Sequence, residues 1–151
     1  YLIDVNVLVY AYREDSPDHE AHREWLESVV NNDRAYAVSE HVLAGFLRIV
    51  THPSIYDPPS ALDAALEFAD RLRGQSNAVI VAPGPRHWDI FNRLCRESGA
   101  RGNLIPDAFL AALAIESGSE WVTTNQGFSR FSGLKGVIHS EIRKPGTEMD
   151  W

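Results

Sequence analysis

Cysteine is almost absent from this chain, which has one in 151 residues. Cys95 alone cannot form a disulfide within the chain, which fits a reducing compartment such as the cytoplasm. No apolar run approaches the roughly 20 residues that a membrane span requires, and no signal peptide is visible. We therefore expect a cytoplasmic protein that does not associate with a membrane.

Basic residues are outnumbered, with 14 Lys and Arg against 21 Asp and Glu and a net charge of −7. Sequence-independent nucleic-acid binding depends on basic surface, so the overall charge argues against a non-specific nucleic-acid binder. The same balance favours a divalent metal or a basic partner. If RNA is the substrate, arginines must be gathered locally or a metal must offset the repulsion.

Several signatures of common sites are missing. The sequence has neither a G-x-G-x-x-G nor a P-loop phosphate-binding pattern, and it has no G-x-S-x-G nucleophile elbow. His19 and His22 are three residues apart on a predicted helix, but no third ligand for a soft metal accompanies them. These patterns therefore point to no nucleotide, serine-hydrolase or zinc site.

Short apolar runs alternate with segments of helical periodicity along the chain. Strands are predicted at 1–3, 35–38, 78–82, 121–124 and 136–138, and helices at 5–13, 17–30, 40–50, 61–72, 86–97 and 108–115. Alternation of this kind indicates a parallel sheet covered on both faces. We predict an α/β fold, a three-layer α/β/α sandwich with a mostly parallel sheet of four to five strands. Residues 1–140 form one domain and 141–151 a polar C-terminal tail.

Two of the predicted helices have distinctive faces. The helix at 108–115 is apolar nearly all round, which is typical of a buried helix. In the helix at 86–97, the spacing places Trp88, Phe91, Leu94 and Cys95 on the inward face.

Four polar residues stand at predicted junctions between strands and helices. Asp4 ends the first strand, Glu40 begins the helix after the second, Asp107 begins the buried helix and Asn125 ends the fourth strand. In a parallel sheet these junctions lie at one edge, where ligands bind in open α/β folds. We therefore expect the four side chains to converge.

Carboxylates that converge in this way repel one another and raise one another's pKa. A Mg²⁺ or Mn²⁺ ion removes that cost, because hard cations take oxygen ligands and keep several waters. Such an ion activates water and stabilises a phosphoryl transition state. The reaction that suits the cluster best is metal-assisted phosphodiester hydrolysis.

Each of these residues also has a purely structural interpretation. Asp4 can cap the helix that follows it, and Asp107 can interact with a helix dipole, an effect of roughly 0.3–1 kcal/mol. Glu40 suits a first helical turn, and Asn125 before Gly127 suits an ordinary turn. The sequence leaves both interpretations open.

Taken together, these residues make the chain similar to PIN-domain proteins, and more narrowly to VapC-type toxins of toxin–antitoxin pairs. The resemblance rests on segments 3–10, 38–40 with 46–53, 102–108 and 123–131. Each segment is short, but the four occur in the family's order and cover nearly the whole chain up to Ile138.

The resemblance implies a Mg²⁺- or Mn²⁺-dependent endoribonuclease, the toxin of a type II toxin–antitoxin system. It also implies a homodimer and inhibition by a cognate VapB-type antitoxin, whose Arg or Lys would meet the carboxylates. Asp4 and Asp107 match the family's metal-binding aspartates, and Glu40 matches an acidic residue present in part of the family. Other members carry Glu one turn further along this helix, where the chain has Gly45.

Asn125 is the clearest departure from the family pattern, which usually has Asp there. An amide oxygen can bind a metal but carries no charge, so a metal, especially a second one, would be held less well. A one-metal site, a lower activity and a loss of function all stay open. Candidates for contacts to RNA phosphate are Arg48, Arg93, Arg96, Arg101 and Arg130.

Two alternative functions use the same residues. An inactive PIN-like binding module that acts through its protein partner would explain Asn125 as decay of the site. A metal-dependent phosphatase for small phosphoesters would use the same carboxylates. For an aspartyl-phosphate phosphatase, however, a second Asp is expected where the chain has Asn6.

Overall fold

A parallel sheet forms the centre of the molecule. The computed structural model describes residues 1–138 and contains a five-stranded sheet of order β3-β2-β1-β4-β5, in which each neighbouring pair is parallel. The strands are β1 (Leu2–Ile3), β2 (Tyr36–Val38), β3 (Ala78–Ile80), β4 (Trp121–Thr123) and β5 (Gly136–Ile138). All five predicted strands are therefore present, close to their predicted bounds.

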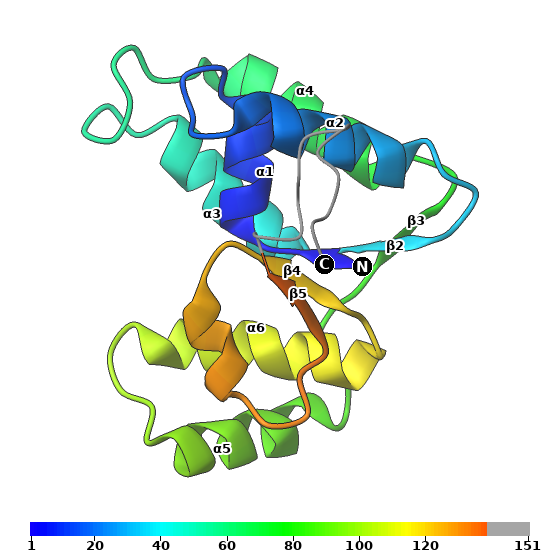
Figure 1. The fold of residues 1–151 in the computed structure, drawn as a ribbon, viewed down its shortest axis with the longest axis vertical. Coiled ribbons are helices and arrows are strands. Elements are labelled where there is room, and N and C mark those ends of the chain that lie inside the picture. Colours follow the sequence, from blue (N-terminus) through cyan, green and yellow to red (C-terminus); the bar gives the residue numbers. More distant parts are fainter. Residues whose placement is uncertain (139–151) are drawn as a thin grey trace, which may run out of the picture.

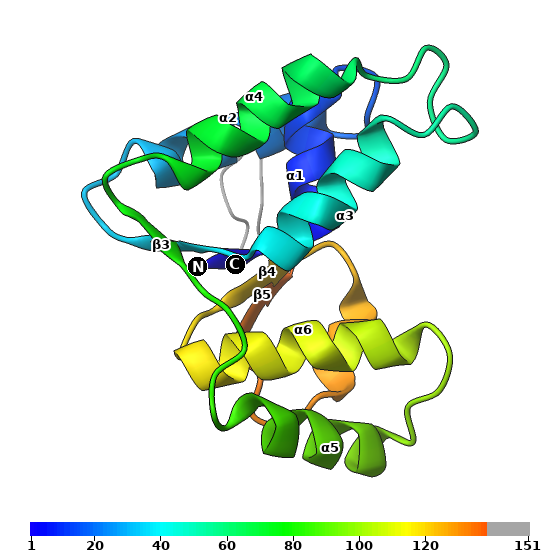
Figure 2. The same ribbon diagram turned by 180° about the vertical axis from the view of Figure 1, so that it is seen from behind.

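Helices cover both faces of this sheet (Figures 1 and 2). One face carries α1 (Val5–Tyr12), α2 (His19–Val30), α3 (Glu40–Val50) and α4 (Leu62–Arg73). The other carries α5 (His87–Ser98) and α6 (Leu104–Ser117), and the 3₁₀-helix η1 (Gln126–Arg130) follows β4. The predicted three-layer α/β/α sandwich is confirmed. The predicted tail, 141–151, lies outside the described residues.

Helix α6 is the most deeply buried helix of its layer. Its buried side chains are Ala108, Leu110, Ala111, Ala112, Leu113 and Ala114. The small alanines let the helix approach the sheet closely while the leucines fill the space between them. The prediction of a buried helix from its apolar sequence is confirmed, and burial of α6 places its first turn beside the sheet edge.

Trp88 contradicts the inward face predicted for α5. Its side chain is 66% exposed, and the residue buried at this end of the helix is His87. A ring nitrogen of His87, Nε2, lies 2.9 Å from the carbonyl oxygen of Phe109 in α6. The two rings also meet edge to face, with centroids 4.4 Å apart. The imidazole takes the inward position because it can satisfy a backbone carbonyl as well as pack.

Ser39 caps the start of α3. Its buried hydroxyl accepts a hydrogen bond from the backbone N–H of Val42 at 3.3 Å. This bond satisfies one of the N–H groups that a helix start leaves without an intrahelical partner. The cap therefore holds the start of α3 at the end of β2.

In the described part of the chain, no helix combines the length and the apolar character that crossing a bilayer demands.

We predict that Ser39→Ala lowers the free energy of unfolding by about 1 kcal/mol, because the N–H of Val42 loses its cap in a buried position. Urea unfolding followed by circular dichroism measures the change. Ser76→Ala, in an exposed turn before β3, is the matched control and should stay within about 0.5 kcal/mol of the wild type. Equal effects of the two substitutions would rule out a capping role.

Candidate metal centre

Asp4 lies at the carboxyl end of β1, where the strand passes directly into α1, and its side chain is only 6% exposed. One carboxylate oxygen, Oδ1, accepts the backbone N–H of Val5 at 2.7 Å. The other, Oδ2, accepts the hydroxyl of Thr123 at 2.6 Å. Within residues 1–138, no basic side chain forms an ion pair with this carboxylate. Asp4 is thus both the helix cap and a buried anion.

Thr123 connects Asp4 to the end of β4. The parallel register pairs Ile3 with Val122, so the next residues, Asp4 and Thr123, are neighbours across the two strands. The Thr123 hydroxyl also accepts the backbone N–H of Asn125 at 3.0 Å. Thr123 was not predicted as a site residue, because nothing in the sequence pairs β1 with β4.

Asp107 supplies the second carboxylate, from the first turn of α6, and is partly buried. Its negative charge is the smallest of the four influences on the pKa of Asp4, so the two carboxyl groups lie within electrostatic reach of each other. Arg130 lies near enough to influence Asp107, but its Nε donates to the carbonyl oxygen of Gly127 at 2.8 Å. No ion pair between Arg130 and Asp107 is formed in the described chain.

Burial is the main cause of the raised pKa values of the two carboxyl groups at this site. It raises the pKa of Asp4 to about 6, against the lowering by the hydrogen bonds from Thr123 and Val5, and the charge of Asp107 adds to the rise. Burial also raises the pKa of Asp107, although the charge of Arg130 lowers it. Two interacting carboxylates that are partly or fully removed from water are costly to ionise without a cation.

A hard divalent ion fits this pair of carboxylates. In the described residues, no group of three or more His, Cys, Asp or Glu side chains is placed to hold a metal. Mg²⁺, however, is usually bound through one or two carboxylates and keeps several waters. Asp4 and Asp107 match that pattern, with Oδ1 and Oδ2 of Asp4 already oriented by their donors.

Glu40 is the first residue of α3, and its side chain is 66% exposed. Its Oε2 lies 3.5 Å from Nε of Arg73 in α4, so the structure does not bring Glu40 together with the two aspartates. At Gly45, one turn further along, a Cβ atom would lie 3.0 Å from Cγ2 of Val5. The close approach of α1 and α3 therefore leaves little room for a side chain there.

Asn125 lies next to the site but is engaged in a turn. Oδ1 of its exposed side chain accepts a hydrogen bond from the backbone N–H of Gly127 at 2.8 Å. This bond caps the start of η1. Its link to Asp4 runs through the hydroxyl of Thr123. The turn interpretation of Asn125 is thus visible in the structure, and a metal-binding role stays a prediction.

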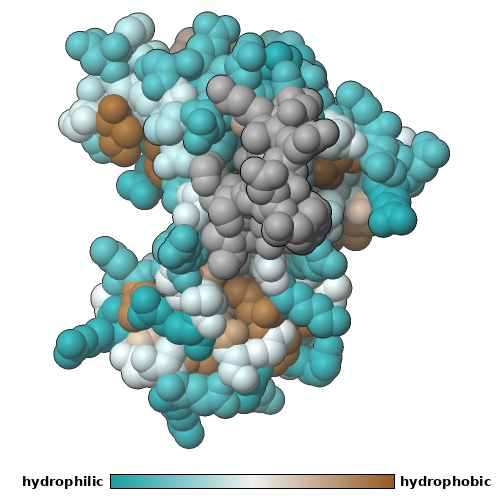
Figure 3. Space-filling model, in the orientation of Figure 1, coloured by the Kyte–Doolittle hydropathy of each residue, from teal (hydrophilic) through white to brown (hydrophobic). Residues whose placement is uncertain are grey.

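The candidate centre faces the side of the molecule at which β1 and β4 end. In Figure 1 this side lies between α1 and α3 above and η1 and α6 below. The surface there is mostly hydrophilic and is indented between the two halves (Figure 3).

Comparison with known proteins identifies the family. The model of the PIN domain matches residues 1–134. The chain belongs to the PIN-domain family. The VapC ribonuclease Mb2897 of Mycobacterium bovis is 40% identical over 133 residues, which are 88% of this chain and 90% of the relative. Ribonuclease VapC25 of Mycobacterium tuberculosis is 37% identical over 137 residues, 91% and 96% of the two chains.

A solved structure agrees with this PIN fold. VapBC2 from Rickettsia felis, bound to a DNA fragment from its promoter, superimposes with a TM-score of 0.66 at 21% identity. The match covers 91% of this chain and 97% of that one. The resemblance to VapC-type PIN domains that the four sequence segments indicated is confirmed.

We predict that the metal-free PIN domain loses stability as the pH rises from about 4 to about 6. The pKa of Asp4 rises from 3.8 to about 6 on folding, so between these values the folded protein holds a proton that the unfolded chain has released. The free energy of unfolding then falls by on the order of 3 kcal/mol and levels off at higher pH.

Urea unfolding in EDTA across this pH range measures the effect. Asp4→Asn should remove most of the decline, because the amide does not ionise. Asp33→Asn, in the exposed turn between α2 and β2, is the control and should follow the wild-type profile. An undiminished decline in Asp4→Asn would mean that another group causes it.

Proposed function

We propose that this protein is the toxin of a toxin–antitoxin pair, an endoribonuclease that hydrolyses RNA phosphodiester bonds with Mg²⁺ or Mn²⁺ held by Asp4 and Asp107. The observation that carries the proposal is the Asp4 carboxylate, which is buried at the end of β1 within electrostatic reach of Asp107 and forms no ion pair within residues 1–138. The relatives are named VapC ribonucleases, which supports RNA as the substrate.

The protein's own residues prepare Asp4 for this role. The hydroxyl of Thr123 donates its single proton to Asp4, and the same oxygen accepts the N–H of Asn125. With the N–H of Val5 on the other oxygen, the carboxylate cannot rotate without losing a bond. A bound Mg²⁺ or Mn²⁺ ion would supply Lewis acidity toward the phosphate and a more acidic water.

We assign Glu40 a supporting role, to orient a water or accept its proton. Its pair with Arg73 is solvent-exposed on both sides. Such exposed pairs contribute about 0–1 kcal/mol, so turning Glu40 away from Arg73 costs little. The side chain starts from the helix that directly follows β2, on the same edge of the sheet as the aspartates.

A VapB-type antitoxin is the partner that we propose. The Rickettsia felis structure is a VapBC complex, and its toxin-like fold covers most of this chain. An Arg or Lys side chain from the partner could form charge-assisted hydrogen bonds with Asp4 and Asp107. Such a contact would occupy the carboxylates that otherwise hold the ion.

We predict that Asp4→Asn or Asp107→Asn reduces Mn²⁺-dependent cleavage of a structured RNA by about a hundredfold or more, since either change removes a charged ligand. Gel analysis of cleavage with purified protein measures this, and circular dichroism checks folding. Asp33→Asn should cleave like the wild type. Full activity in either site variant would reject the assignment. Hydrolysis of a generic phosphomonoester in preference to RNA would favour the phosphatase alternative.

We predict that Asn125→Asp tightens Mn²⁺ binding roughly tenfold and speeds cleavage, because a carboxylate replaces a neutral amide beside the site. Calorimetric titration with Mn²⁺ measures the affinity. Gln126→Glu, which adds the same charge one residue later, is the control and should bind like the wild type. No gain in Asn125→Asp would leave Asn125 as a turn residue only, and the absence of Mn²⁺ binding in the wild type would favour the inactive binding module.

A further inference from the structure

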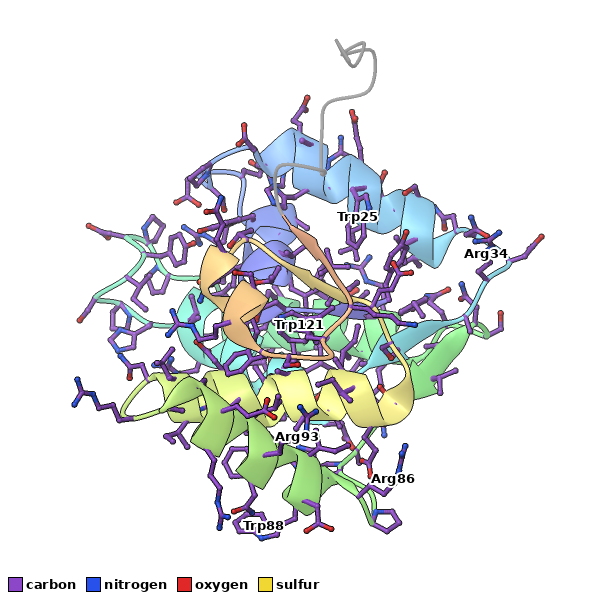
Figure 4. The ribbon with its side chains drawn as sticks, turned by 60° about the horizontal axis from the view of Figure 1, so that its bottom comes forward. Trp25, Arg34, Arg86, Trp88, Arg93 and Trp121 are labelled. Carbon is purple, nitrogen blue, oxygen red and sulfur yellow. The ribbon has the colours of Figure 1, made fainter. Side chains whose placement is uncertain are left out.

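Trp88 is unusual because a large indole ring projects into solvent. At 66% exposure it is the most exposed of the large hydrophobic side chains in the described chain. Figure 4 shows it on the side of α5 that faces away from α6. Burial of such a ring is strongly favourable, and its exposure therefore requires an explanation that packing within the protein does not supply.

Aromatic neighbours anchor this ring. The ring of Trp88 lies 5.5 Å from that of Phe91, centroid to centroid. Phe91 in turn lies 5.9 Å from Phe109 in α6, in an edge-to-face contact. Trp88 is thus the outer end of an aromatic row that begins two residues after Asp107, and the row holds the indole as a platform with an open face.

The positive charge that the whole chain lacks is concentrated around α5. Between residues 86 and 101 there are four arginines and two acidic residues, in a protein of net charge −7. Arg93 is paired with Glu97 at 3.2 Å. Arg96 and Arg101 are exposed and, in the described chain, take part in no ion pair.

Trp88, Asn92 and Arg96 follow one another at intervals of four residues, so they lie on the same side of α5. They line one shallow depression, together with Asp89, Arg93 and Glu97. At 1.5 Å per residue, Arg96 lies about 12 Å along the helix axis from Trp88. The depression therefore offers a flat apolar face at one end and a free cation at the other.

This surface leads toward the candidate metal centre. Helix α5 ends at Ser98, the loop 99–103 carries Arg101, and α6 begins at Leu104 with Asp107 in its first turn. In Figures 1 and 2, α5 and α6 lie side by side, and the loop joins the end of one to the start of the other. A chain bound along α5 would therefore approach Asp107.

We propose that Trp88, Arg96 and Arg101 form a binding subsite for single-stranded RNA, which we call the α5 strip. The indole stacks on an unpaired base, and the two guanidinium groups bind phosphates toward the metal centre. Aromatic stacking tolerates any base, so the strip adds affinity and little sequence preference. The inference rests on the proposed ribonuclease function and answers how an acidic protein holds an anionic substrate.

The test measures by fluorescence anisotropy how tightly the protein binds a fluorescein-labelled single-stranded RNA of mixed sequence. The RNA is about 12 nucleotides long, within the roughly 4–16 that single-strand sites span. EDTA is present to block cleavage. Trp88→Ala should weaken binding on the order of tenfold, whereas Trp88→Phe should stay within about threefold of the wild type. Ile55→Ala, which removes another exposed apolar side chain from a distant loop, should leave the Kd unchanged.

The salt dependence of Kd separates stacking from charge. Arg96→Gln should reduce the slope of log Kd against log salt concentration by about 0.7, the value for one phosphate of a single strand. Trp88→Ala should weaken binding without changing this slope. An unchanged Kd in Trp88→Ala overturns the proposal. The proposal is also overturned if Trp88→Ala both weakens RNA binding and changes the molecular mass of the protein in light scattering, because the strip would then contact a second copy of the chain.

The outcome is distinguishable from failure of the proposed function. If the wild type binds the RNA through Trp88 but does not cleave it with Mn²⁺, the α5 strip stands and the nuclease assignment fails. If the wild type cleaves RNA and Trp88→Ala has wild-type Kd and KM, the nuclease stands and the α5 strip fails.

Discussion

A carboxylate buried at the end of a central strand is the constraint on which the rest of this structure depends. Asp4 follows a two-residue strand whose side chains are almost completely removed from water. Its oxygens are satisfied by one hydroxyl and one backbone N–H, and these bonds offset part of the cost of removing a charge from water. The pKa of Asp4 is nevertheless raised, so the hydrogen bonds do not offset the whole cost of burying the charge.

The layers around the sheet serve to keep that carboxylate in place and to bring others near it. The apolar body of α6 packs into the second layer and so presents Asp107 at the strand ends. On the opposite face, α1 approaches α3 closely at Gly45. Packing of apolar side chains therefore sets the spacing of the charged groups, since close-packed elements cannot shift without opening a cavity.

Most of the fold was predictable because its signals are local. Strand 121–123 and helix 40–50 are marked by apolar runs and by a capping serine, all within a few residues. Trp88 was predicted wrongly because helical spacing alone cannot say which of two adjacent residues turns inward. In the structure His87 takes the inward position, where its ring nitrogen lies within hydrogen-bonding distance of the carbonyl oxygen of Phe109, and the indole of Trp88 is exposed to solvent.

The sequence by itself determined that Asp4 ends the first strand and that Asp107 stands at the start of the buried helix. Only the tertiary structure decided what surrounds them. Thr123 meets Asp4 because β1 and β4 are neighbours, and Glu40 meets Arg73 because α4 packs beside α3. Strand order and helix packing join residues far apart in the chain, and the energies that select them are spread over many contacts with no local signature.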